Sequence, residues 1–378
     1  MDEAPSTIAP GGRLARLLAM LESDPRNLPL LGEAAEAALA ERHPQSAQAL
    51  LQRYAEISIL PPRELNLSGL AALQLGEFAA AAACFESLLD SGEEDGALRF
   101  NLAWTRAMQK DFDGALALLS DELADALPQA GMLQVQLLHQ LGEFDLGAAR
   151  ARRLVELHPE HAGLMAAVSV LAMDVEDAEL AAYCAARAPG HPDALATLGT
   201  LALGEERPED ALDMFNRALE RNGAVPRAWV GRGLAELLAG RSERAAADID
   251  RGAEMFGSHL GSWIAAGWAH FVSGDLSASR ARFETALRLD SAFAESHGSL
   301  AVVDLLEGNA ASARRRAEIA FRLDKQCFSA ALARTLLAAG EGNGDNARRI
   351  FELALNTPVD PSGRTIAQSM AKLAMARG

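Results

Sequence analysis

Only a few residues in the sequence have types and spacings that could do chemistry. His158 and His161 could bind a metal ion, but Pro159 stands between them and the surrounding pattern predicts a turn between helices. In the segment 257–261, GSHLG, the serine stands second and not at the centre, so it does not match a nucleophile elbow. The glycine-rich segment 340–344 follows a predicted helix and no strand, which indicates a helix turn and not a phosphate loop. We therefore expect no catalytic residue, no cofactor and no metal, and the chain is not predicted to be an enzyme.

The cysteines and the N-terminus bear on the cellular compartment. Cys84, Cys184 and Cys327 lie far apart in predicted helices, where a free buried thiol is the default interpretation. Nothing in this pattern requires an oxidising compartment. The first twelve residues are polar and acidic, without the basic and apolar regions of a signal peptide, and no apolar run is long enough to span a membrane. The sequence predicts a cytoplasmic protein.

Composition and charge restrict both the fold and the partner. Hydrophobic residues make up 49% of the chain, aromatic residues only 5%, and alanine dominates, which favours closely packed helices. The formal net charge of −17 argues against nucleic acid or an anionic membrane surface as the main partner, because either would need a basic surface. The charge fits a basic protein partner, but it also fits solubility alone, and both interpretations stay open.

A small residue recurs at a spacing of 34 residues along most of the chain. Four residues after it, on the same helical face, stands a larger residue such as Phe85, Phe215 or Phe283. Two shortened units, around Gly147 and Ala181, separate the two regular series. The small residues of these series are Ala47, Ala81 and Ala115, then Ala211, Ala245, Ser279, Ala313 and Ala347.

A second regularity predicts two helices in each unit. Five residues before the small residue, a glycine is expected to end the first helix with a positive φ. Those glycines are Gly76, Gly142, Gly240, Gly274, Gly308 and Gly342. Seven residues before the turn, the first helix carries its own small residue, as at Gly69, Ala103, Gly199, Gly233, Gly267 and Ala301. Two small positions allow the helices to cross closely, and the larger residue is expected to pack into the next unit.

A unit of 34 residues with these features resembles the tetratricopeptide repeat family. Trp229 and Trp263, each four residues before a small glycine, match the family's tryptophan site, and LGEF at 75–78 and 141–144 matches its turn. The resemblance covers roughly residues 28–361. It implies an all-α, right-handed superhelical solenoid of about ten antiparallel helix pairs with capping helices at both ends.

One unit departs from the family pattern. At 162–191 the segment MDVEDAEL stands where the turn glycine belongs, so the geometry of that turn is open and we expect a bend there. The predicted organisation is a disordered tail 1–12, an N-terminal capping helix 13–27, repeats 28–191, more regular repeats 192–360 and a C-terminal capping helix 361–378.

The resemblance implies that the first helices line a concave groove that binds a helix or a peptide of a partner protein. Projected onto this sequence, the groove positions are Phe100, Trp104, Met132, Gln136, Val230, Leu234, Ile264, Trp268 and Phe271. Trp104 and Trp268 lie outside the family's structural tryptophan site, and exposed aromatics on such a face often mark contact sites. The alternatives are that the superhelix buries both side chains, or that this alignment is one residue out of phase.

The nature of these residues indicates what the groove would bind. The family's clamp for an acidic C-terminus is poorly matched, because Arg63, Asn66 and Asn101 are present but the facing positions after them are apolar. An amphipathic helix or an extended apolar segment fits better. The favoured function is a non-catalytic protein–protein interaction scaffold or adaptor. The alternatives are a chaperone that masks a hydrophobic segment of a secretion, pilus or envelope component, and a non-catalytic repeat subunit of a transferase complex. Self-association is also possible.

Overall fold

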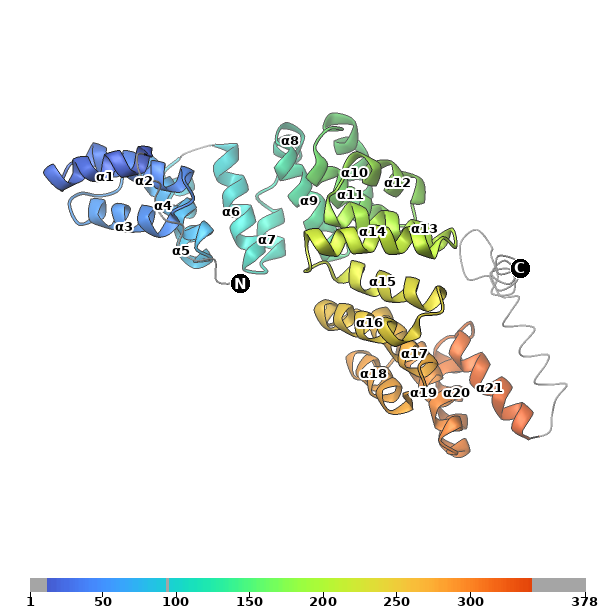
Figure 1. Cartoon of the computed structure of the whole chain (residues 1–378). Coiled ribbons are helices and arrows are strands. Elements are labelled where there is room, and N and C mark those ends of the chain that lie inside the picture. Colours follow the sequence, from blue (N-terminus) through green and yellow to red (C-terminus); the bar gives the residue numbers. More distant parts are fainter. Residues whose placement is uncertain (1–11, 93–94, 342–378) are drawn as a thin grey trace. The chain divides into compact units, whose positions relative to one another are not determined.

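The structure is a computed structural model that describes residues 12–92 and 95–341 (Figure 1). Within these ranges the regular elements are α-helices and none is a strand, so the expected all-α repeat fold is confirmed. No helix in the described ranges is long and apolar enough to cross a membrane. The chain divides into two compact units, Met1–Asp177 and Ala178–Gly378, each of which is described by itself.

The first unit is a stack of antiparallel helix pairs that begins with a single helix. Leu14, Leu17 and Leu21 of this helix, α1, are buried in a core shared with α2 and α3. The pairs that follow are α2/α3, α4/α5, α6/α7 and α9/α10. The elements are α1 (Arg13–Ser23), α2 (Leu28–Ala40), α3 (Pro44–Ala55), α4 (Pro62–Gln74), α5 (Phe78–Asp90), α6 (Gly96–Met108), α7 (Phe112–Leu116), α8 (Asp121–Ala126), α9 (Pro128–Leu141), α10 (Phe144–Leu157) and α11 (Ala162–Asp174).

The second unit continues with longer and more regular pairs, namely α13/α14, α15/α16, α17/α18 and α19/α20 (Figure 1). The division between the units falls between α11 and α12, inside the segment 162–191, where the bend stays a prediction. The elements are α12 (Ala178–Arg187), α13 (Pro192–Gly204), α14 (Pro208–Arg221), α15 (Pro226–Leu238), α16 (Ser242–Phe256), α17 (Leu260–Val272), α18 (Leu276–Leu289), α19 (Ala294–Leu306), α20 (Ala310–Leu323) and α21 (Phe328–Gly340). The predicted second helix after α21 and the cap 361–378 lie outside the described residues.

The turn inside each pair has one geometry, with or without glycine. Gly142 has a φ of 78°, and its neighbour Glu143 donates its backbone N–H to the carbonyl of Leu138 at 2.9 Å, which is the bond of a Schellman cap. Glu176, in the segment MDVEDAEL, has a φ of 60°, and Asp177 N–H bonds Ala172 O at 2.8 Å. The open turn is therefore regular. Three further non-glycine residues adopt the same left-handed conformation, Arg42, Lys110 and Glu206.

The small positions give the close helix crossings that their spacing predicted. The ring of Phe85 lies against Gly69 of its own pair, and Phe215 lies against Gly199. Phe215 also contacts Gly231 of the following pair. Phe215 thus packs both onto the small residue of its own unit and, as expected, into the next unit. The repeated small residues of the second helices, from Ala47 to Ala313, are buried.

The first helices lie on the inner side of each stack. In the second unit α13, α15, α17 and α19 each contact the next first helix, whereas no two successive second helices among the described residues of that unit pack together to the same extent. In the first unit α2 contacts α4, and α6, α9 and α11 contact one another in turn. This asymmetry means that the first helices approach each other more closely than the second helices do, so each stack curves with the first helices inside.

One unit is irregular in a way that the 34-residue pattern does not show. The second helix after α6 stops at Leu116, and a new helix, α8, begins where the Ser120 hydroxyl accepts the N–H of Leu123 at 3.2 Å. The break leaves the carbonyl of Leu119 without a helical partner, and the buried side chain of Gln134 donates to it at 3.1 Å. Arg150, buried on α10, donates to Gln134 at 3.0 Å. A satisfied polar network therefore replaces one turn of helix.

Candidate functional site

In the first unit, the predicted groove residues share one face of α6 and α9. Phe100 and Trp104 are half-buried, with ring centroids 6.3 Å apart, and both pack on a core that includes Ala103. On α9, Met132 is half-buried and Gln136 is exposed. Each of these aromatic rings therefore has one part in the core and another part that a partner could reach.

In the second unit, the predicted aromatic residues form a cluster on α17. The ring of Trp268 lies edge-on to Phe271 at 5.0 Å between centroids, and to Phe283 of α18 at 5.4 Å. Trp268, Phe271 and Ile264 are half-buried against the same core, so Trp268 is neither fully in solvent nor fully enclosed. Val230 and Leu234 on α15 are half-buried against a neighbouring core. The binding role of all nine residues stays a prediction, and they form two surfaces in two separately described units.

Sequence reasoning missed the most exposed residues of this face. Leu238, Val272 and Leu306 are the last residues of α15, α17 and α19, and 37%, 64% and 55% of their surfaces are exposed. In the first unit Met108, the last residue of α6, is likewise 46% exposed. Each of the four residues lies two positions before the turn residue with the positive φ. The three residues of the second unit are 34 residues apart in the sequence. That periodic apolar position was the signal that could have revealed them.

These residues extend the predicted groove positions along the same helical face. Residues four apart lie on one side of a helix, so Val272 continues the row that Ile264 and Trp268 begin, and Leu238 continues that of Val230 and Leu234. We call this surface of the second unit the apolar stripe. It consists of Val230, Leu234 and Leu238 on α15, Ile264, Trp268 and Val272 on α17, and Leu306 on α19; Val302, four residues before Leu306, is buried.

The two remaining tryptophans have a different, structural arrangement. Trp229 Nε1 donates to the carbonyl of Gly223 at 2.9 Å, and Trp263 Nε1 donates to that of Gly257 at 2.8 Å. Each indole therefore holds the loop that precedes its own helix. Arg251 stacks its guanidinium on the ring of Trp229, 4.0 Å from the centroid. This arrangement separates the family's tryptophan site from the partly exposed Trp104 and Trp268.

The histidines that could have bound a metal make structural hydrogen bonds instead. His158 Nε2 lies 2.8 Å from the carbonyl of Asp125, and His161 Nδ1 accepts the N–H of Leu164 at 3.0 Å as the cap of α11. The pKa of His161 is lowered mainly by burial and to a smaller degree by the charge of His158. His259, in the segment GSHLG, caps α17 in the same way. Within the described ranges no group of three potential ligands is placed to hold a metal ion.

An all-helical stack of antiparallel pairs, with small residues at each crossing and the first helices inside, defines the class of repeat solenoids. Residues 66–130 and 196–258 match the family model of the tetratricopeptide repeat. These two segments are therefore tetratricopeptide repeats, the family that the turns and tryptophans of the sequence resemble. Repeats of this family generally mediate protein–protein interaction. A search of curated protein sequences finds no match to this chain.

Solved structures agree on the fold. A structure of a human IFIT1 dimer with m7Gppp-AAAA has a TM-score of 0.52 and 11% identity, over 94% of this chain and 97% of that one. A monomeric IFIT1 mutant with Gppp-AAAA has a TM-score of 0.52 and 12% identity, over 90% and 93% of the two chains. The Cut9–Hcn1 hetero-tetramer of APC/C has a lower TM-score of 0.42 at 15% identity, over 90% of this chain and 80% of that one. At such identities the likeness shows the fold alone.

Proposed function

We propose that the chain is a non-catalytic scaffold or adaptor that binds an apolar segment of another protein along the apolar stripe. The observation that carries this proposal is the exposure of Leu238, Val272 and Leu306 at one equivalent position of three successive pairs. Successive first helices contact one another, so the three side chains lie along one surface and not at scattered sites. Apolar side chains gathered in this way favour a partner, because binding removes them from water.

The half-buried residues beside them would give the surface its specificity. Trp268 is fixed by its edge-on contacts with Phe271 and Phe283, so it loses little conformational freedom when a partner covers its exposed part. Rigid aromatic anchors surrounded by aliphatic side chains are typical of the residues that dominate binding energy at protein interfaces. An amphipathic helix that places apolar residues at intervals of three and four would suit such a face.

The ligands in the IFIT1 structures are not carried over to this chain. That protein's structures contain Gppp-AAAA or m7Gppp-AAAA, whereas this chain has a formal net charge of −17 and its candidate surface is apolar. Binding to nucleic acid depends on neutralising phosphates with lysine and arginine, and the apolar stripe contains neither. A protein partner is therefore the better proposal.

An affinity capture with paired variants tests this function. Val272→Glu/Leu306→Glu places charge on the apolar stripe, and Leu289→Glu/Leu323→Glu places the same charge on second helices, where these leucines are 46% and 45% exposed. We expect the stripe variant to lose at least about tenfold of the captured partner, since desolvating two charges costs several kcal/mol. The control should retain it. Equal capture by both variants, with circular dichroism showing both folded, would contradict the proposal.

A further inference from the structure

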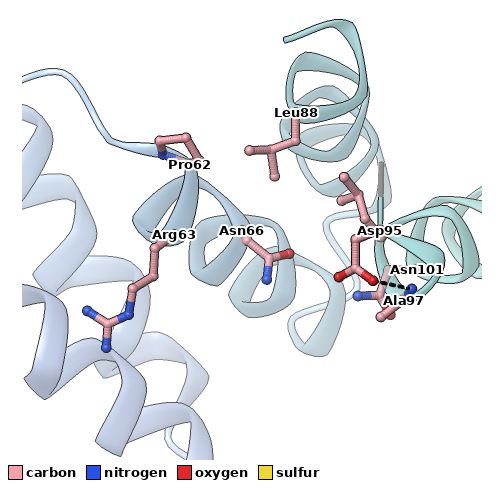
Figure 2. Close-up of a pocket in the computed structure, with 8 residues that line it drawn as sticks. Pro62, Arg63, Asn66, Leu88, Asp95, Ala97 and Asn101 are labelled. Carbon is pink, nitrogen blue, oxygen red and sulfur yellow. Dashed lines mark hydrogen bonds between the residues drawn. The ribbon is translucent and has the colours of Figure 1, made fainter. Parts of the chain in front are cut away.

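A small polar cavity lies in the first unit, between the N-terminal halves of α4 and α6. Its volume is about 190 Å³. Figure 2 shows the side chain of Asn66 directed toward Asp95 and Asn101, while that of Arg63 points away from them. Leu88 of α5 also lines the cavity. Three polar groups from two neighbouring repeats thus meet in one cavity on the first-helix side.

One of these groups has no partner of its own. The Oδ1 atom of Asn66 is buried and accepts no hydrogen bond from the described part of the chain. A buried acceptor left unsatisfied costs about 1–3 kcal/mol, and buried polar atoms of native proteins are nearly all paired. The cavity therefore calls for a hydrogen-bond donor, which could be a water molecule or a group of a ligand.

The surrounding charges favour a cationic donor. Arg63 is already paired, with Glu36 at 2.8 Å and Glu64 at 3.2 Å, so its charge is neutralised outside the cavity. Asp95 caps α6 by accepting the N–H of Ala97 at 3.0 Å, and this bond offsets the positive end of the helix. The carboxylate of Asp95 has a second oxygen and lies at the exposed mouth of the cavity. The net local charge is negative.

We propose that this cavity binds the ammonium group of a lysine side chain of the partner. An ammonium has three donors and no acceptor, which suits the Asn66 oxygen, the Asp95 carboxylate and the Asn101 amide oxygen. Phe100, the neighbour of Asn101 on α6, would contact the apolar part of the same segment. The proposal rests on the proposed protein-binding function, and the net charge of −17 is compatible with a basic partner.

The test uses small probes, so it does not depend on knowing the partner. The full chain, labelled with ¹⁵N, is titrated with Nα-acetyl-lysine methylamide while the side-chain amide signals of Asn66 and Asn101 are followed. We expect saturable shifts with a dissociation constant on the order of millimolar, as one small group can supply only a few kcal/mol. The norleucine analogue has the same chain without the charge, and the glutamate analogue carries an anion. Neither should saturate.

Two variants make the test specific. Asp95→Asn keeps a good helix cap and removes the charge, and it should weaken lysine binding at least fivefold. Asn66→Asp adds a negative charge at the unpaired oxygen and should strengthen binding at least threefold. Absence of saturation up to about 50 mM, equal binding of norleucine, preference for the glutamate probe, or indifference to both variants would overturn the proposal and leave only a water site. Capture of a partner through the apolar stripe could still succeed, which separates the two claims.

Discussion

The ring of Phe215 on α14 lies directly against Gly199 on α13, where an added β-carbon would stand 2.7 Å from ring atom Cε1. A real side chain does not tolerate such a distance, so the pair of residues sets how closely the two helices can approach. The same relationship holds between Phe85 and Gly69. It is the physical reason for the repeated small positions.

Gly199→Ala should therefore destabilise the second unit. We expect a loss of about 1–3 kcal/mol in the free energy of unfolding, because an overpacked crossing forces the ring or the helix to move. Gly204→Ala, on the same helix, is the control, since an added β-carbon there meets nothing within 4 Å. That change should be neutral or stabilising by up to about 1 kcal/mol through helix propensity. Urea unfolding followed by circular dichroism measures both, and equal effects would count against this account of the crossing.

The left-handed turns predict a stabilising substitution. Lys110 has a φ of 66°, a conformation that costs a residue with a β-carbon about 1 kcal/mol. Lys110→Gly should relieve this cost and raise the urea midpoint of the first unit. Gln109→Gly is the control because Gln109, with a φ of −81°, is not strained and only gains freedom in the unfolded chain. The idea fails if both variants lower the midpoint equally.

A buried ion network joins three helices of the second unit and predicts loss of stability in acid. Asp304 on α19 is only 4% exposed and accepts from Arg280 at 2.6 Å and from Arg316 at 3.1 Å. Burial alone would raise the pKa of Asp304, but its hydrogen bonds with Arg280 and Ser312 and the charges of both arginines outweigh it, so the pKa lies below 3.8. The unfolded chain then binds the proton more readily, and stability falls as pH drops through and below about 3.8.

Asp304→Asn should lower the free energy of unfolding at pH 7 by about 3 kcal/mol, the order of magnitude expected when a buried ion pair is broken. It should also flatten the loss of stability between pH 5 and pH 3, because the titrating carboxylate is gone. Asp213→Asn is the control. It removes a surface pair with Arg217, in which Asp213 is 61% exposed, so the expected change is below about 1 kcal/mol. Unfolding midpoints of both variants, measured at several pH values, test these expectations. An unchanged pH profile for the Asp304 variant would contradict the assignment.

The cap of α11 predicts a second pH effect nearer neutrality. His161 accepts an N–H with Nδ1 only while this nitrogen is unprotonated, and its pKa lies below 6.5. The unfolded chain therefore takes up the proton first, and the cap's contribution is lost as pH falls below about 6.5. His161→Asn retains an N-cap that does not titrate, and it should add about 0.5–1 kcal/mol to the free energy of unfolding. A wild-type unfolding midpoint of the first unit that stays flat between pH 7 and pH 5, and matches this variant, would contradict the role of His161.

Much of the fold could be predicted because it repeats. The 34-residue period predicted the helix pairs and the small positions at their crossings. The turn at Glu176 could not be settled from its residues, since glutamate gives no sign of the left-handed conformation that it adopts there. The break between α7 and α8 also went unseen. It depends on Gln134, which satisfies the freed carbonyl of Leu119 from 15 residues away.

The candidate site was predicted less completely. Family spacing identified the face that carries Trp104 and Trp268, but their half-buried state follows from contacts across helices, such as that of Trp268 with Phe283. Val272 and Leu306 are visible in the sequence as an apolar position that repeats every 34 residues, four residues beyond the groove positions that the family resemblance implies on the same helices. The unpaired oxygen of Asn66 depends on how α4 and α6 approach each other, which no local pattern encodes.

The central claim is that the apolar stripe touches the partner, and photo-crosslinking tests it most directly. A photoreactive phenylalanine is placed in the full chain at position 272, on the stripe, or at position 289, on a second helix where Leu289 is 46% exposed. Irradiation in cells that produce the chain, followed by mass spectrometry, identifies adducts. We expect one stoichiometric partner crosslinked from position 272 and not from position 289, with apolar residues at the attachment site. Adducts from position 289 alone, or equal adducts from both positions, would contradict a binding surface on the first helices.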